Sequence, residues 1–266
     1  MTAEDRTLEA LGLAGVPRED PLLYPGVWPA DSGLLDGDRL LPLDRLVHPD
    51  RVPVLAVGSN ASPGQLRHKM AESGITATVP MVRARVTGVD VGVSAHVSRM
   101  GYVSASPVEA PGRVRELFVL WLDAEQLEAV DASEGVPRPD GNYGRAWLPS
   151  PDVRVDLADG TSLPGAYVYV NRHGVLHDGT GVPRTHPGQR ELLTELLVGS
   201  PALRELFGTT AEEFSARARA DVLLCTRGTR LFAEEKRVVD SGLERYLELQ
   251  QTGSPGTGPS LAPPRT

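Results

Sequence analysis

The sequence contains little cysteine, few aromatic residues, no excess of basic residues and no long apolar run. Its one cysteine, Cys225, excludes an intramolecular disulfide and any multi-cysteine metal site. No apolar stretch approaches the roughly 18 residues of a membrane-spanning helix. The formal net charge of −8 argues against a nucleic-acid partner, because such binding relies on a basic face that neutralises phosphates. Residues 1–5 are acidic, unlike a secretory leader, so we expect a cytoplasmic protein with no membrane partner.

The residues that are plentiful are small or turn-forming. Aromatic residues make up only 5% of the chain, so the core must rest mainly on valine, leucine and alanine. Glycine and proline, with 28 and 23 of the 266 residues, exceed their usual combined share of about 12%. This composition predicts many turns and loops rather than a helical bundle.

The two ends of the chain differ in composition from the middle. Residues 1–50 contain six prolines and five glycines and predict an N-terminal extension that packs on the main domain. Residues 251–266 consist largely of Gly, Pro, Ser and Thr and predict a disordered tail, because they cannot bury enough apolar surface to offset their ordering entropy. Residues 51–250 are expected to form one domain that ends in helices.

The first part of this domain predicts a strand, a loop and a helix in succession. Residues 52–57 form a short apolar run typical of a buried strand. The small residues 58–61 follow as a tight loop. Ser62 then stands at a helix N-cap, with Pro63 at the first helical position and Gln65 three residues after the cap.

The remainder predicts further strands and then helices. Asp123 and Gln126 form a capping pattern, and Gly135 ends that helix. A leucine stripe begins at Leu192, and Thr210 caps a later helix. Strands are expected over residues 81–93, 102–108, 113–122, 143–157 and 165–171, and a last helix over residues 234–249. This order predicts a mixed α/β or α+β domain.

Gly58, Ser59 and Asn60 form a loop of small residues before a helix. Such a loop lets a ligand approach the backbone closely, and its N–H groups together with the helix N-terminus can hold a carboxylate or a developing oxyanion. An ordinary strand-to-helix turn is the alternative. A Walker A loop is excluded, because no Lys-Ser or Lys-Thr pair follows Gly64.

Glu134 stands at the end of the helix that Asp123 caps. A carboxylate there faces the negative end of the helix dipole. If the side chain is also buried, its pKa is expected to be raised, which suits a proton shuttle near neutral pH. The alternative is a solvated surface glutamate.

The histidines and the cysteine give weaker signals. His173 and His177 have the spacing of a helical metal pair, with His186 nearby, but surrounding glycines and prolines predict a loop over a pocket instead. His96 near a strand end is expected to be a hydrogen-bonded structural residue. Cys225 lies in an apolar run and is expected to be a buried residue rather than a nucleophile. No metal or cofactor is predicted.

Residues 52–172 resemble the γ-glutamylcyclotransferase-like family. Residues 54–60 (Val-Leu-Ala-Val-Gly-Ser-Asn) match that family's Tyr-Gly-Ser-Asn loop, and Glu134-Gly135-Val136 with Tyr143 follows at the family's distance. The resemblance implies a small β-barrel with flanking helices and a pocket at one end. The family's aromatic residue before Gly-Ser-Asn is Val57 here.

The resemblance also implies a cofactor-free enzyme of the transferase or lyase type. The α-amine of a γ-glutamyl compound would attack its own γ-carbonyl and release 5-oxoproline and an amine or amino acid. Glu134 would act as general acid and base, residues Val57 to Asn60 would bind the substrate, and Tyr143 would line the pocket. Two alternatives stay open: a non-catalytic module that binds a small ligand, and an amide hydrolase on the same scaffold.

Overall fold

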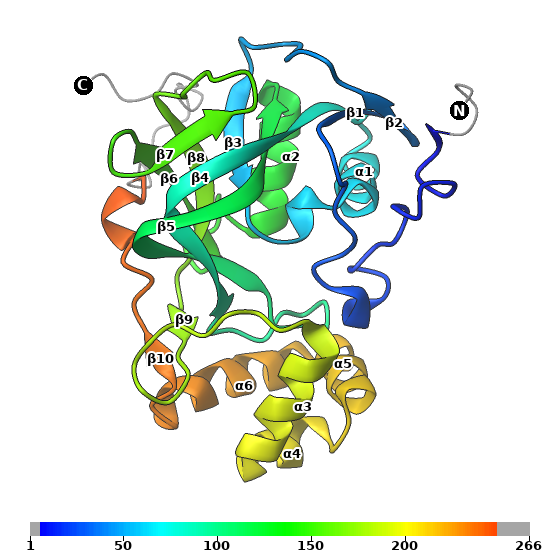
Figure 1. Cartoon of the computed structure of the whole chain (residues 1–266). Coiled ribbons are helices and arrows are strands. Elements are labelled where there is room, and N and C mark those ends of the chain that lie inside the picture. Colours follow the sequence, from blue (N-terminus) through cyan, green and yellow to red (C-terminus); the bar gives the residue numbers. More distant parts are fainter. Residues whose placement is uncertain (1–5, 249–266) are drawn as a thin grey trace.

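The computed structural model of the chain describes residues 6–248 (Figure 1). It has a curled mixed sheet with helices α1 and α2 beside it, and a separate group of four helices, α3 to α6, next to one end of the sheet. The tail predicted over residues 251–266 lies outside the described residues. Within residues 6–248, every helix is too short or too polar to span a membrane.

The sheet contains ten strands among the described residues. Their hydrogen-bonded order is β10-β9-β4-β5-β3-β8-β6, with β1 and β7 attached to β4 and β2 attached to β1. This order does not close on itself, so the described strands do not show the small closed barrel that the family resemblance implied. The strands are β1 Gly33–Asp36, β2 Arg39–Pro42, β3 Val52–Ala56, β4 Thr78–Ser94, β5 Ala105–Leu122, β6 Tyr143–Pro149, β7 Arg154–Leu157, β8 Gly165–Asn171, β9 Val175–Leu176 and β10 Val238–Val239.

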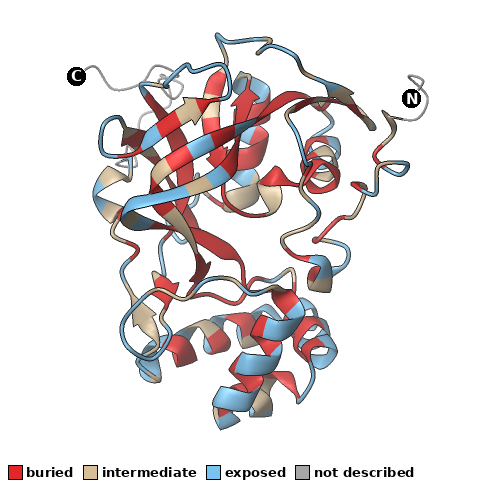
Figure 2. Ribbon diagram, in the orientation of Figure 1, coloured by how far each residue is buried: buried red, intermediate tan, exposed pale blue. Residues whose placement is uncertain are grey.

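The central strands are buried on both faces, as the red strands in Figure 2 show. Val54 and Ala56 of β3 face a core shared with α1 and α2, whereas Leu55 and the adjacent Val57 face a second core inside the curl of the sheet. Side chains alternate between the faces of a strand, so burial on both faces requires an apolar run without alternation. This is why residues 52–57 are almost wholly apolar.

Strands β4 and β5 bend sharply where their register shifts between Thr87 and Gly88. Gly88 has a φ of +103°, and a Cβ at this position would lie 2.8 Å from the Asp152 carbonyl oxygen, so a side chain cannot be placed there without strain. Because of the bend, Ala105 at the start of β5 returns to the loop after β3. The strands predicted separately over 102–108 and 113–122 are therefore one bent strand.

Helices α1 (Pro63–Glu72) and α2 (Ala124–Glu134) pack on the same core through residues such as Leu66 and Val130. Asp123 and Gln126 make the predicted capping box at the start of α2, and Gly135 ends the helix at a φ of +82°. Ser62 precedes α1 but its side chain makes no capping hydrogen bond, which differs from the prediction.

An N-terminal segment, residues 6–50, runs along α1 and contributes β1 and β2 to the sheet edge. The Gly64 N–H at the start of α1 donates a 3.1 Å hydrogen bond to the Leu13 carbonyl. Gln65, predicted to act in capping, instead accepts a 2.9 Å hydrogen bond from the Arg18 N–H. The N-terminus of α1 is therefore covered by this segment and does not point into open space.

A helical lobe, residues 189–234, packs Leu192, Phe207, Phe214 and Phe232 into a core that it shares with residues of the sheet such as Val93. Its helices are α3 Gln189–Gly199, α4 Pro201–Phe207, α5 Ala211–Ala220 and α6 Val222–Glu234. The Thr210 capping box is present, as predicted.

The prediction of a last helix over residues 234–249 is wrong, because α6 already ends at Glu234. Lys236 has a φ of +56° and Gly242 a φ of +81°, and both values interrupt a helix. Val238 and Val239 between them pair with β9, as β-branched residues readily do.

Candidate active site

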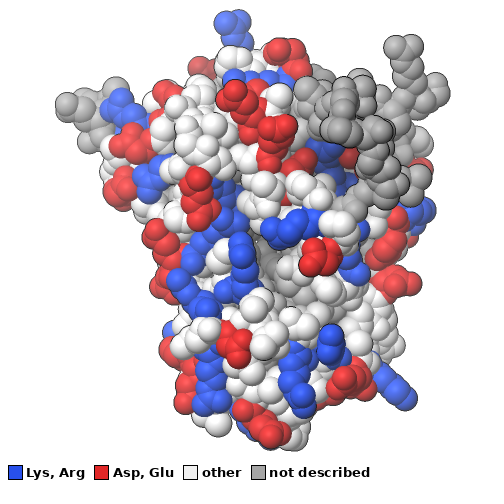
Figure 3. All heavy atoms as spheres, turned by 180° about the vertical axis from the view of Figure 1, so that it is seen from behind, with Lys and Arg blue, Asp and Glu red and all other residues white. Residues whose placement is uncertain are grey.

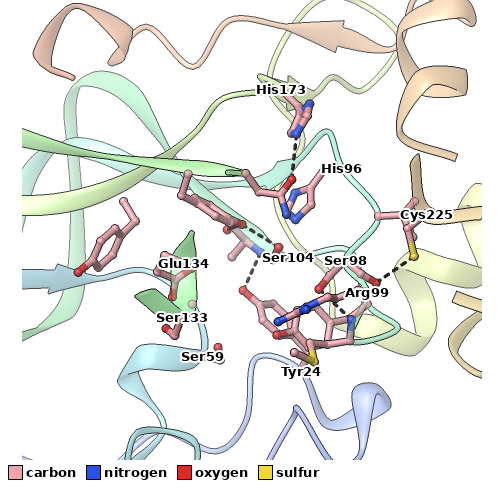
Figure 4. Close-up of a pocket in the computed structure, with 18 of the residues that line it drawn as sticks. Tyr24, Ser59, His96, Ser98, Arg99, Ser104, Ser133, Glu134, His173 and Cys225 are labelled. Atoms are coloured by element: carbon pink, nitrogen blue, oxygen red, sulfur yellow. Dashed lines mark hydrogen bonds between the residues drawn. The ribbon is translucent and has the colours of Figure 1, made fainter. Parts of the chain in front are cut away.

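A cavity of about 770 Å³ lies between the edge of the sheet and the helical lobe (Figure 4). The topology of the sheet explains why it is lined by residues distant in sequence. Strands β3 and β8 are parallel, with Val54 opposite Tyr167, so their carboxyl ends meet at one edge. Strand β6 runs antiparallel to β8 and begins at that same edge, with Tyr143 opposite Asn171. The loop after β3 and Tyr143 therefore line the same cavity.

Glu134 at the end of α2 also faces this cavity. Its Oε1 accepts a 3.1 Å hydrogen bond from Asn60 Nδ2 and a 2.7 Å hydrogen bond from Lys69 Nζ. Lys69 Nζ also donates to Asn60 Oδ1 at 2.7 Å. The three side chains thus form a closed triangle that joins the small-residue loop, α1 and α2. The Lys69 side chain is only 4% exposed and that of Glu134 only 16%.

The structure corrects the expected pKa of Glu134. Burial acts to raise this pKa, as predicted, but the charge of Lys69, the hydrogen bonds from Lys69 and Asn60, and the charge of Arg18 outweigh it and hold the pKa below its ordinary value. Glu134 is therefore an ionised carboxylate at neutral pH. Burial lowers the pKa of Lys69 from its ordinary value, although Glu134 opposes this shift.

The loop residues Gly58, Ser59 and Asn60 line the cavity, as does Val57. Residues Ser59–Ala61 form a short 3-10 helix, whose first N–H groups have no partner within the helix itself. The N-terminus of α1 is not part of this site, because residues 13–18 cover it. The predicted anion site is thus reduced to the loop. Val57 is 8% exposed and packs in the core inside the sheet.

Four of the six tyrosines in the chain line the cavity: Tyr24, Tyr102, Tyr143 and Tyr169. Burial raises the pKa of each phenol, and the negative charge of Glu134 raises it further. The pKa of Tyr102 reaches about 12. All four phenols therefore keep their protons at neutral pH.

Hydrogen bonds fix these tyrosines in place. The Tyr143 hydroxyl lies 2.7 Å from Ser104 Oγ, and the Tyr169 hydroxyl donates to Asp131 Oδ1 at 2.7 Å. Asp131 is held in turn by Arg145, at 2.9 Å. These hydrogen bonds hold two of the four phenols in defined positions in the cavity wall.

The cavity carries more positive than negative charge. Two of its arginines, Arg99 and Arg230, lie on the side of the helical lobe and make no ion pair among residues 6–248. On the face seen in Figure 3 the molecule is hollowed near its middle, and Lys and Arg side chains gather beside the hollow. The charged residues that line the cavity are the cations Arg18, Lys69, Arg99, Arg138 and Arg230 and the acids Glu134 and Asp140. In a chain of net charge −8, this local excess favours an acidic ligand.

The histidines do not converge on a metal site. His96 is 2% exposed, and its Nδ1 lies 2.8 Å from Asn171 Nδ2. Burial is the main cause that lowers the pKa of His96 to about 3, and the nearby His173 lowers it further. His177 Nε2 and His186 Nε2 face the carbonyls of Lys236 and Val103 in separate loops. Within residues 6–248, no three His, Cys, Asp or Glu side chains are grouped so that they can hold a metal ion.

Cys225 lines the far wall of the cavity from α6 and is 4% exposed. Its thiol donates to the Ala218 carbonyl at 3.1 Å, and burial raises its pKa to about 11. A protonated thiol is a poor nucleophile at neutral pH, so Cys225 is better described as part of the wall.

Sequence reasoning missed Lys69, Arg18 and Tyr24. A signal for Lys69 was present: it is one of only two lysines among 27 basic residues. It also follows Leu66 by three residues and precedes Met70, so it lies on the apolar face of α1. No comparable local signal marks Arg18 or Tyr24, because they reach the site from a loop.

No family model matches the chain, and no curated protein matches it significantly. Among solved structures, a γ-glutamyl cyclotransferase aligns with a TM-score of 0.36 and 15% identity over 76% of this chain and 92% of that one. The uncharacterized protein loc79017 from Homo sapiens aligns with a TM-score of 0.33 and 18% identity, and the match spans 45% of this chain and 66% of that chain. Similarities this weak carry no argument about activity, which must be inferred from the site.

Proposed function

We propose that the chain is a γ-glutamylcyclotransferase-like enzyme that uses Glu134 as its general base and acid. The observation that carries the proposal is the 3.1 Å hydrogen bond between Asn60 of the small-residue loop and the Glu134 carboxylate. Two segments 74 residues apart in sequence thus meet on one cavity. A proton-accepting group and a set of backbone donors are then adjacent, as an intramolecular amide exchange requires.

The proposed reaction needs no water and no external nucleophile. The α-nitrogen of the substrate forms a bond to its own γ-carbonyl carbon, and the bond from that carbon to the leaving nitrogen breaks. Glu134, ionised because of Lys69, accepts a proton from the α-ammonium. Glu134 then passes this proton to the leaving nitrogen, takes up the second proton that the ring nitrogen loses on becoming the lactam N–H, and gives it to the released amine. The products are 5-oxoproline and a free amine or amino acid.

The remaining groups of the site would hold the substrate folded. Backbone N–H groups of Gly58 to Asn60 would stabilise the negative charge that develops on the γ-carbonyl oxygen. Tyr143, which Ser104 holds in place, would line one side of the pocket and donate a hydrogen bond to a polar atom of the substrate. Holding the α-nitrogen close to the γ-carbonyl carbon of the same substrate molecule supplies much of the rate enhancement in such a ring closure.

The proposed leaving group carries an acidic group. Arg99 and Arg230 line the cavity together with the hydroxyls of Thr226 and Thr229 of α6. A carboxylate on the leaving amino acid or peptide would compensate these cations.

The proposal is tested by incubating the protein with γ-glutamyl dipeptides and γ-glutamyl amides and identifying the products by mass spectrometry. Replacement of Glu134 by Gln should lower the rate of 5-oxoproline release by about 10²- to 10⁴-fold, the usual contribution of a general base. Glu128→Gln is the matched control, because Glu128 is an exposed residue on the same helix.

The products decide between the proposed enzyme and its alternatives. Release of glutamate instead of 5-oxoproline would identify an amide hydrolase, in which water replaces the internal amine. Tight binding of a γ-glutamyl compound without turnover would identify a binding module. Equal turnover by the Glu134→Gln variant and the wild type would contradict the assignment of the base.

A further inference from the structure

The N-terminal segment, residues 6–50, forms one wall of the cavity. Two of its side chains, Arg18 and Tyr24, line the cavity together with Glu134. The segment is tied to the helices of the site at several points, including the Gly64–Leu13 and Gln65–Arg18 hydrogen bonds. Its position is therefore fixed by the same elements that position the proposed base.

Arg18 joins the ends of the two helices that carry Lys69 and Glu134. Its guanidinium forms an ion pair with Glu72, the last residue of α1, and donates a 3.3 Å hydrogen bond to the Ser133 carbonyl near the end of α2. The Arg18 side chain is only 11% exposed. Its Nε is buried and has no hydrogen-bond partner among residues 6–248. The guanidinium thus has donor capacity that the protein itself does not use.

Arg18 is also close to Glu134 electrostatically, since its charge helps to hold Glu134 ionised. In the proposed reaction the α-ammonium of the substrate must reach Glu134. The α-carboxylate is attached to the same carbon atom as that ammonium, so it must lie within a few ångströms of it. Lys69 is already engaged by Glu134 and Asn60, whereas Arg18 lines the cavity and keeps its Nε without a partner among residues 6–248.

Tyr24 supplies a hydroxyl beside the small-residue loop. Its oxygen accepts a 2.8 Å hydrogen bond from the Ala105 N–H and lies 2.5 Å from the position that a Cβ on Gly58 would occupy. Gly58 therefore has to be a glycine if the phenol is to lie over the loop. The ring is 4% exposed and stacks on Tyr102, with 4.6 Å between the ring centres. Because the oxygen is the acceptor toward Ala105, its own proton is available to a ligand.

We propose that the N-terminal segment binds the γ-glutamyl half of the substrate, with Arg18 paired to the α-carboxylate and the Tyr24 hydroxyl donating to a substrate oxygen beside Gly58. This inference rests on the proposed function, because the proposed reaction fixes where the α-carboxylate lies. It assigns to residues 6–50 a role in recognition as well as in packing. It also predicts that amides without an α-carboxylate are poor substrates.

The experiment compares two substrates in four proteins. The first substrate is a γ-glutamyl amide, and the second is the matching 4-aminobutanoyl amide, which lacks only the α-carboxylate and would close to 2-pyrrolidinone. The proteins are the wild type, Arg18→Gln, Tyr24→Phe and the control Tyr246→Phe. The control removes a phenol hydroxyl that is hydrogen-bonded at 2.6 Å to Asp152, outside the cavity.

The wild type should prefer the γ-glutamyl amide. Arg18→Gln should lower kcat/KM for it about tenfold or more, mainly through KM, and should lower kcat/KM for the second substrate much less, because that substrate has no α-carboxylate. A purely structural defect would reduce kcat/KM for both substrates equally and would overturn the role of Arg18.

Tyr24→Phe should lower kcat/KM for both substrates about tenfold, whereas Tyr246→Phe should not. Equal activity of Tyr24→Phe and the control would overturn the role of Tyr24. Thermal unfolding of each variant identifies a loss of fold.

Failure of the proposed function gives a different result. If the wild type releases no product from any γ-glutamyl compound, the enzyme proposal fails, and the inference is judged by calorimetric binding of a γ-glutamyl dipeptide. Weaker binding by Arg18→Gln and Tyr24→Phe than by Tyr246→Phe would support it. Equal binding by all four proteins, or none by the wild type, would overturn it.

Discussion

Lys69 is the residue on which the charge state of the site depends. Burial alone would raise the pKa of Glu134, and the nearby ammonium reverses that direction. The choice of lysine is informative, because all but two of the 27 basic residues in this chain are arginines. An ammonium changes its pKa readily when it is buried, whereas a guanidinium stays charged.

Replacement of Lys69 by Met should move the acid limb of the pH–rate profile to higher pH. Without the ammonium, the charge and the hydrogen bond that Lys69 supplies are lost, so the pKa of Glu134 rises. A protonated Glu134 cannot accept the substrate proton, so activity is lost at a higher pH than in the wild type. The measurement is kcat/KM against pH for both proteins. Lys236→Met, which replaces the other lysine, is the control, and an unshifted acid limb in Lys69→Met would contradict the prediction.

Helix α2 shows how a single element delivers a functional side chain. The capping box of Asp123 and Gln126 sets where the helix begins, and Gly135 sets where it ends. Glu134 is consequently the last helical residue and projects at the helix terminus toward the loop after β3. The helix dipole disfavours a carboxylate there, and Lys69 on the neighbouring helix offsets that effect.

Gly135→Ala should therefore reduce activity as well as stability. At a φ of +82°, an alanine costs about 1–2 kcal/mol, and its Cβ would lie 2.7 Å from Arg138 Nη2 and 3.3 Å from Gly141 Cα. The matched control is Gly160→Ala, which has a φ of +87° in an open turn away from the cavity. Thermal unfolding should show a loss of stability in both variants, larger in Gly135→Ala because of these contacts, whereas kcat should fall only in Gly135→Ala. Unchanged kcat in Gly135→Ala would mean that the end of α2 is not critical for Glu134.

The whole molecule combines an acidic chain with a basic cavity. The net charge is −8, yet five cations and two acids line the space between the sheet and the helical lobe. Clefts lined by one sign of charge concentrate ligands of the opposite sign. The helical lobe contributes Arg230 to this surface and shares a hydrophobic core with the sheet, so it takes part in the site.

Salt should weaken the binding of acidic substrates more than that of neutral ones. Exposed charges are screened as the Debye length falls to about 3 Å near 1 M salt. KM for a γ-glutamyl dipeptide should therefore rise with salt more steeply than KM for a γ-glutamyl alkylamide. Arg230→Gln should reduce the difference, whereas Arg227→Gln on the same helix, outside the cavity, should not. Equal salt dependence for both substrates would argue against an acidic leaving group.

The sequence by itself determined the local framework of this protein: the buried strand over residues 52–57, the loop of Gly58 to Asn60, and the helix that ends at Glu134. These features depend on hydrophobic runs, caps and glycine conformations within a few residues, which a sequence displays directly. The tertiary structure decided which charges surround Glu134. Lys69 is 65 residues from Glu134 in sequence, and Arg18 is 115 residues from Ser133, so neither contact leaves a local pattern. The direction of the Glu134 pKa shift followed from those distant partners, because an ionisable group responds to the charges around it in space rather than along the chain.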